Sequence, residues 1–158
     1  MYDIRDIINK AIALANQKRE LYIKACEDIN APDVLLVLKV VLKTIEKEIE
    51  HYNTMIKNIT NEMAEGIDFA TYDKVSSLVA QFSKIMIAPK LHNKNELVLF
   101  IIDLEEQIYA LLVDIQGRMV TNEAVASTVS YYVLNELISE KEQYISNLRG
   151  FVGVREEQ

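Results

Sequence analysis

Apolar residues recur at steps of three or four along most of the chain, which is the spacing of one face of an α-helix. The first such segment covers residues 3–29, and its apolar face comprises Ile4, Ile8, Ala11, Ala15, Tyr22, Ala25 and Ile29. The second runs from Pro32 to about Met63, with Leu38, Leu42, Ile45, Ile49, Tyr52, Ile56 and Ile59 on its face. At ~1.5 Å per residue, each helix would be about 40 Å long. The pattern therefore predicts two long amphipathic helices.

Three further helices are predicted in the rest of the chain. Between Ala64 and His92, a shorter one is expected to begin at a Thr71 cap and to end before Pro89, with Val75, Leu78, Val79, Phe82, Ile85 and Met86 on its apolar face. Residues 93–96 (Asn-Lys-Asn-Glu) resemble a capping box, which predicts a long helix from Leu97 to about Gln116 that stops at Gly117.

The last long helix is expected to begin at a cap formed by Thr121 or Asn122 and to continue to about Phe151. Its inward positions are Val125, Val129, Val133, Leu137, Tyr144 and Leu148. The whole chain of 158 residues holds only four glycines and two prolines, about a third of their usual frequency. So few turn-forming residues disfavour sandwiches and barrels. The sequence therefore predicts an all-α protein with one domain, residues 1–158.

The lengths of the connections predict the topology. The first two long helices, and the last two, are joined by only a few residues, so each pair should form an antiparallel hairpin. A crossover at about residues 64–93 separates the hairpins. Such a crossover is needed if the third long helix runs parallel to the second, as in ferritin-like folds. We therefore expect a ferritin-like four-helix bundle whose crossover contains a short extra helix.

Charge and composition exclude several functions. The chain has 24 acidic and 17 basic residues, a net charge of −7, so nucleic acid and anionic membranes are not expected partners. The longest apolar stretches, 34–41 and 97–102, are too short to span a membrane. The N-terminal residues lack the apolar segment of a secretory signal, and a cytoplasmic location is expected. A single cysteine, Cys26, allows no intramolecular disulfide and no CxxC metal ribbon.

A duplicated motif carries the candidate chemistry. Residues 48–51 read Glu-Ile-Glu-His, and residues 140–143, on the last helix, read Glu-Lys-Glu-Gln. Glu48 lies between Ile45 and Tyr52 on the inward stripe, and Glu140 interrupts the stripe of its own helix in the same way. A charged side chain on an apolar face must be paired, neutralised or bound to a metal. Two such glutamates at matching positions therefore favour a polar site inside the bundle.

Residues 12–17 of the first long helix also align with residues 102–107 of the third. With this plan, the whole chain resembles the rubrerythrin-like branch of the ferritin-like superfamily, whose members are di-iron carboxylate four-helix bundles. The resemblance implies a glutamate from the first and third long helices and a Glu-x-x-His from the second and fourth. It implies Glu48, His51, Glu105 and Glu140 as metal ligands.

Two positions depart from the family pattern, and a nearby lysine bears on the same site. Ala15 stands where the glutamate of the first helix belongs, and Gln143 replaces the second histidine. The missing carboxylate at position 15 should lower affinity for iron, because hard cations depend on carboxylate charge. Gln143 alone would be acceptable, since ferritins tolerate a glutamine near one iron. Lys18, one turn after Ala15, either extends to solvent, which is the more common arrangement, or places its ammonium where a metal would sit.

The sequence leaves three hypotheses about metal binding open. In the first, a di-iron centre reduces peroxide or oxidises ferrous iron; with one cysteine there is no rubredoxin domain, so an external protein would donate electrons. In the second, the bundle binds no metal and acts as a binding or interaction module, which predicts an inward contact of Lys18 with Glu48, Glu105 or Glu140. In the third, Glu48, His51 and another carboxylate hold one iron, zinc or manganese ion. A homodimer is expected in each case.

Overall fold

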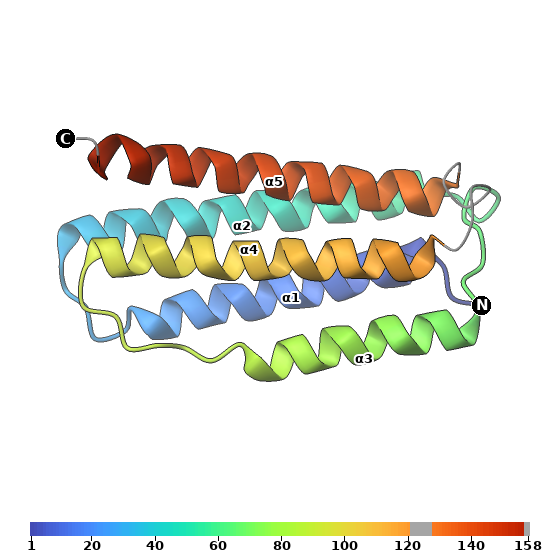
Figure 1. Cartoon of the computed structure of the whole chain (residues 1–158), viewed down its shortest axis with the longest axis horizontal. Helices are drawn as coiled ribbons and strands as arrows, with labels where there is room; N and C mark the ends of the chain where they lie inside the picture. The colour runs from blue at the N-terminus through green and yellow to red at the C-terminus, as the bar shows by residue number, and fades with distance from the viewer. Residues whose placement is uncertain (121–127, 157–158) are drawn as a thin grey trace. The chain divides into compact units, whose positions relative to one another are not determined.

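The computed structural model of the chain describes residues 1–120 and 128–156, with only the backbone described at 151 and 153–156. The described residues form no strand, and the predicted all-α class is confirmed. The helices are labelled in Figure 1: α1 Ile4–Ala25, α2 Pro32–Asn58, α3 Phe69–Ile85, α4 Lys94–Met119 and α5 Val129–Glu156. The chain divides into two compact units, Met1–Lys94 with α1 to α3 and Asn95–Gln158 with α4 and α5.

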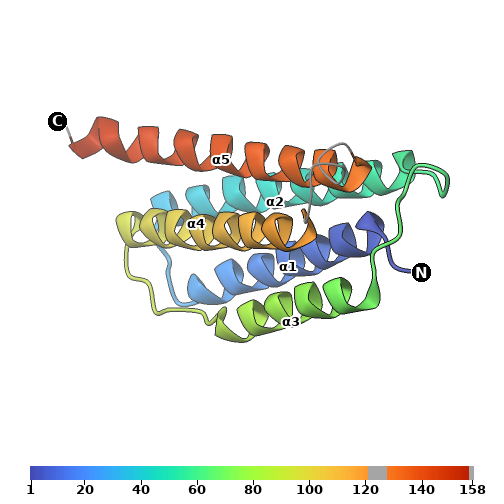
Figure 2. The same ribbon diagram turned by 45° about the vertical axis from the view of Figure 1, so that its right-hand side comes forward.

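In the first unit, α1 and α2 are antiparallel neighbours that lie side by side in both views (Figures 1 and 2). Pro32 is the first residue of α2, as predicted, where its missing N–H leaves no helical hydrogen bond unmade. The helix ends at Asn58, before the predicted end near Met63. The core of this hairpin is apolar and includes the fully buried Ile8 and Val34. Ile8 lies on the predicted stripe of α1. On α2, Val34, Val41 and Met55 are buried although they lie outside the predicted stripe, and its members Leu38, Leu42, Ile49 and Ile56 are only half-buried.

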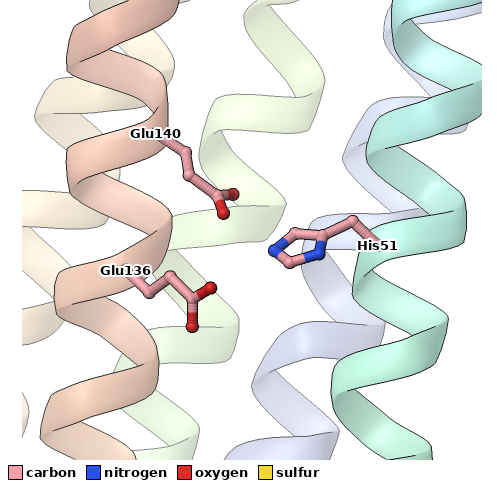
Figure 3. A group of neighbouring side chains, drawn as sticks. All are labelled: His51, Glu136 and Glu140. Atoms are coloured by element: carbon pink, nitrogen blue, oxygen red, sulfur yellow. The ribbon is translucent and has the colours of Figure 1, made fainter.

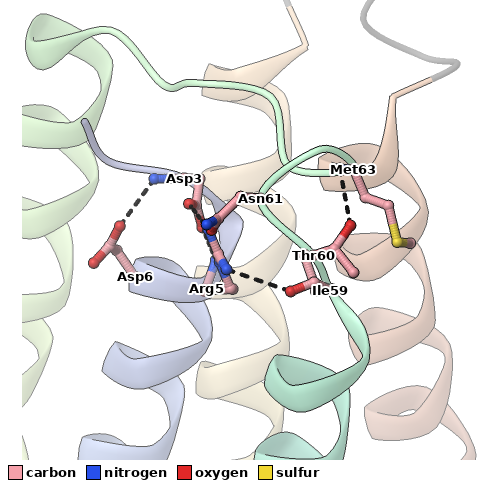
Figure 4. Close-up of polar contacts among 7 residues, drawn as sticks. All are labelled: Asp3, Arg5, Asp6, Ile59, Thr60, Asn61 and Met63. Carbon is pink, nitrogen blue, oxygen red and sulfur yellow. Dashed lines mark hydrogen bonds and ion pairs between the residues drawn. The ribbon is translucent and has the colours of Figure 1, made fainter.

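The start of α1 is fixed by a network around Asp3 (Figure 4). The Asp3 carboxylate accepts the backbone N–H of Arg5 at 2.8 Å, and the Asp6 carboxylate accepts the backbone N–H of Asp3 at 2.9 Å. This is a complete capping box. The Arg5 guanidinium donates to Asp3 and also to the Ile59 carbonyl and the Asn61 side chain. Arg5 therefore ties the beginning of α1 to the chain just after α2.

The short helix α3 begins at an Asp68 cap instead of the predicted Thr71 cap. The Asp68 carboxylate accepts both the backbone N–H and the hydroxyl of Thr71, each at 2.8 Å. Aspartate is a strong cap because its charge also interacts favourably with the positive end of the helix. Thr71 is thus the third residue of the helix, and its backbone N–H donates to the capping carboxylate. The helix ends at Ile85, before Pro89, as predicted.

Contacts spread along α1 hold α3 against it (Figures 1 and 2). The Gln17 amide donates to the Ser83 carbonyl at 2.8 Å and accepts the Ser83 hydroxyl at 2.5 Å. Near the other end of α3, the Tyr2 and Tyr72 rings stack with centroids 3.6 Å apart, and the Lys10 ammonium lies 5.1 Å from the Tyr72 centroid. The helix of the crossover therefore packs with the first hairpin.

In the second unit, α4 and α5 run antiparallel. Gln116 donates to Asn135 at 2.9 Å near one end, and Arg149 forms an ion pair with Glu106 nearer the other. The predicted stop at Gly117 is wrong, because α4 continues through that glycine to Met119. A glycine in the last turn weakens a helix only slightly, so it does not require an end there.

The helix α5 likewise passes Gly150 and the predicted end near Phe151, and it extends to Glu156. The expected caps Thr121 and Asn122, and the expected inward Val125, lie outside the described residues. None of the helices in the described ranges is long and apolar enough to cross a membrane.

We predict that Asp3→Ala lowers the free energy of unfolding by about 1 kcal/mol, because it removes the N-cap of α1. Urea denaturation followed by circular dichroism measures this loss. The control is Asp73→Ala, an exposed aspartate inside α3, which should change stability much less. Equal effects of the two substitutions would contradict the cap's contribution.

The stabilising effect of Asp3 should also depend on pH. Its hydrogen bond with the Arg5 guanidinium lowers the pKa of the Asp3 carboxyl below the ordinary value of 3.8. A group with a depressed folded-state pKa stabilises the fold above its unfolded pKa, and that stabilisation disappears as pH falls through the folded pKa. The difference in unfolding free energy between wild type and Asp3→Ala should therefore shrink from about pH 6 to about pH 3. A difference in unfolding free energy that stays constant between these pH values would contradict the contribution of the ionised Asp3 carboxylate.

Candidate metal centre

Lys18 is a buried residue of α1 with 1% of its surface exposed. The expectation that its side chain extends to solvent is therefore wrong. Its ammonium donates to the Glu48 carboxylate of α2, with Nζ 3.1 Å from Oε2. Ala15, one turn earlier on α1, is also buried. The face of α1 that was expected to supply a glutamate thus supplies a methyl group and a cation.

Glu48 is held through both carboxylate oxygens. Oε2 accepts from Lys18, and Oε1 accepts from the Tyr52 hydroxyl at 2.9 Å, one turn further along α2. The glutamate side chain is 17% exposed, so the pair is largely removed from water. Charge-assisted hydrogen bonds of this kind orient a carboxylate and neutralise it. The inward position predicted for Glu48 therefore contains a paired carboxylate.

The second unit contains another buried ion pair. Glu105 of α4 is 1% exposed, and Lys141 of α5 is 4% exposed. The Lys141 ammonium lies 2.7 Å from Glu105 Oε2. Two candidate ligands from different units, Glu48 and Glu105, thus each form an ion pair with a lysine on the neighbouring helix of the same unit.

Sequence reasoning missed Lys141, although a signal was present. Lys141 lies four residues after Leu137 and four before Ile145, both buried. That spacing continues the inward face of α5. Glu140 is exposed, so the prediction that it interrupts the buried stripe is wrong. On a helix, neighbouring residues point about 100° apart, and here the lysine takes the core position.

Glu136 and Glu140 project from the same side of α5, one turn apart (Figure 3). Both residues are exposed. Gln143, which replaces the second histidine of the family pattern, is exposed as well, and its amide donates to Asn147 at 3.0 Å. Within the second motif, Glu140 and Gln143 are therefore exposed, whereas Lys141 is buried.

His51 lies on α2, three residues after Glu48, and is half-buried. Its ring centroid is 6.4 Å from that of Tyr52 (His51 is drawn in Figure 3). The other histidine, His92, is exposed. Glu48 and His51, three residues apart on one helix, offer a carboxylate and an imidazole, two ligand types that bind zinc or iron.

The donor atoms of the described residues fit a di-iron centre poorly. Such a centre needs several carboxylates free to bridge two hard cations. Position 15 offers no donor, and Glu48 and Glu105 are bonded to ammonium groups that a cation would have to displace. Because like charges repel strongly in a low-dielectric interior, a metal ion and the two lysines would compete for the same carboxylates.

No family model, curated protein or solved structure matches this chain.

We predict that Lys141→Met lowers the free energy of unfolding by about 3–5 kcal/mol, because it leaves the buried Glu105 carboxylate without its lysine. The double variant Lys141→Met/Glu105→Leu should recover most of that loss, since replacing both charges removes the desolvation penalty. Urea denaturation measures both.

Arg118→Met is the control for this prediction, because it breaks an ion pair with Asp114 that is exposed at both partners. It should change stability far less than Lys141→Met. A double variant as unstable as Lys141→Met would contradict the buried-charge explanation.

Proposed function

We propose that this chain is a ferritin-like four-helix bundle without a di-iron centre, which acts as a binding or interaction module. The observation that carries the proposal is the inward contact of Lys18 with Glu48 at 3.1 Å. The metal-free hypothesis predicts an inward contact of Lys18 with Glu48, Glu105 or Glu140, and the contact with Glu48 is one of these three. The di-iron hypothesis, in which Lys18 extends to solvent, does not predict a contact between Lys18 and Glu48.

Charge supports the same conclusion. A metal centre in the interior is stabilised by the carboxylates that surround it, and those carboxylates in turn need the metal's charge. Here Lys18 and Lys141 provide positive charge to Glu48 and Glu105. Peroxide reduction or iron oxidation would require metals that these lysines oppose. The site therefore supports a structural core better than a redox centre.

In the proposed architecture, α1, α2, α4 and α5 are the four long helices of the bundle, and α3 belongs to the crossover. The antiparallel order within each unit and the position of α3 in the sequence between α2 and α4 support it. We further propose that the protein is a cytoplasmic homodimer whose partners are proteins, since its net charge of −7 disfavours nucleic acid and anionic membranes.

A second candidate is a mononuclear metal protein that uses His51. The observation that favours it is the pair of exposed carboxylates, Glu136 and Glu140, one turn apart on α5 (Figure 3). An imidazole with one or two carboxylates is a donor set suited to Zn²⁺ or Fe²⁺. This candidate requires that His51 and a carboxylate of α4 or α5 bind the same ion.

We predict that protein purified after iron-replete growth carries less than about a tenth of an equivalent of iron, zinc or manganese. Inductively coupled plasma mass spectrometry measures the content. About two equivalents of iron would establish the di-iron reading instead.

One equivalent of metal that disappears in His51→Ala would establish the mononuclear reading. The matched control is His92→Ala, which changes an exposed histidine outside the motif. Metal lost equally from both variants would show binding that does not depend on the Glu-x-x-His motif.

A further inference from the structure

The two buried lysine–glutamate pairs are arranged in opposite order along the chain. In the first unit, the lysine lies on the first helix of the hairpin and the glutamate on the second: Lys18 on α1 and Glu48 on α2. In the second unit, Glu105 lies on the first helix, α4, and Lys141 on the second, α5. Each unit thus contains one ion pair between a lysine and a glutamate of neighbouring helices.

The internal repeat shows what each lysine replaces. When residues 12–17 are aligned with 102–107, Lys18 corresponds to Ile108, and when residues 48–51 are aligned with 140–143, Lys141 corresponds to Ile49. Each lysine therefore stands where the other hairpin has an isoleucine. The repeat does not require a charged residue at either position, because an isoleucine occupies the equivalent position of the other hairpin. Each lysine therefore adds a charge at an otherwise apolar position.

We infer that the ammonium groups of Lys18 and Lys141 supply the positive charge that a metal ion would otherwise supply to the carboxylates of this helical core. Because both groups are part of the chain, they cannot dissociate as a metal ion can. The inference rests on the proposed metal-free function and gives that function a mechanism. Each lysine supplies a compact charge on a flexible chain, which suits a single carboxylate at short distance. Both ammonium groups are almost completely buried and both reach carboxylates, at 3.1 and 2.7 Å.

The physical consequence is a core that needs no metal for stability. A buried carboxylate without a counter-charge is strongly unfavourable, so Glu48 and Glu105 each need a cation whenever the protein is folded. A free metal ion would supply it only when available, and its affinity would couple folding to metal concentration. Tethered ammonium groups remove that dependence, because they are present in every molecule.

The direct test detects the lysine ammonium groups of the full-length protein by ¹⁵N nuclear magnetic resonance. The variants Lys18→Ile and Lys141→Ile assign the two signals, with Lys39→Ile, an exposed lysine of α2, as the control. We expect two signals with slow hydrogen exchange that keep about nine-tenths of their intensity when one equivalent of paramagnetic Mn²⁺ is added. Selective broadening of both signals by Mn²⁺ would overturn the inference, because the metal would then share the site.

A second measurement compares melting temperatures with and without excess Mn²⁺ or Zn²⁺. Wild type should show no shift, whereas Lys18→Ile/Lys141→Ile should gain a metal-dependent rise, because its carboxylates then lack their cations. Lys18→Arg/Lys141→Arg retains the charges and should not respond. A folded isoleucine double variant that ignores both metals would overturn the inference.

The isoleucine double variant could be too unstable to purify. In that case, Glu105→Ala/Lys141→Ile removes both charges of the second pair and gives that hairpin the residues of the first at these positions, Ala15 and Ile49. It should fold and show no metal response, and a metal-dependent rise in this variant would also overturn the inference.

Failure of the inference and failure of the proposed function are distinguishable. Metal in the purified protein that depends on His51 would refute the metal-free function, even if the two lysine signals stayed sharp. Conversely, a metal-free protein whose lysine signals exchange rapidly, as the signal of an exposed lysine does, would leave the function standing and refute the role of Lys18 and Lys141.

Discussion

The burial of carboxylates between helices is the constraint on which the interior of this protein depends. Glu105 is almost fully buried and Glu48 largely so, and each requires a positive charge within hydrogen-bond distance. Lys18 and Lys141 meet that requirement from the neighbouring helix. Because breaking such a pair costs much more than forming it gains, the pairs limit which helix registers are compatible with folding. A shift of one residue along α5 would move Lys141 off the face that contacts α4.

A different set of interactions holds the crossover in the first unit. The capping box at Asp3, the reach of Arg5 to Ile59, the stacked Tyr2 and Tyr72 rings and the Gln17 contact all involve α1 or the residues just before it. These contacts are polar or aromatic and lie partly at the surface, so each contributes modestly. The Tyr2–Tyr72 stack and the Gln17–Ser83 contact fix the position of α3 along α1, while the apolar faces provide the burial.

Much of the fold could be predicted from the sequence, because helical periodicity and capping are local properties. The helices and the position of Pro32 at the start of α2 followed from residues within a few positions of each other. The errors have local physical reasons too. Asp68 is a stronger cap than Thr71, and Gly117 lies where a helix tolerates glycine. The motif at 48–51 led correctly to Glu48 as a partly buried polar position, whereas Glu140 at 140–143 is exposed.

The sequence by itself determined an all-α chain of long amphipathic helices with a duplicated Glu-x-x-(His/Gln) motif. Only the tertiary structure decided which charged residues are buried and what they contact. It placed Lys18 inward, and it selected Lys141 over the adjacent Glu140. The physical reason is that neighbouring helical residues differ by about 100° in direction, a difference that an apolar stripe alone does not resolve. Packing against the neighbouring helix resolves it, because the buried carboxylate on that helix requires a cation.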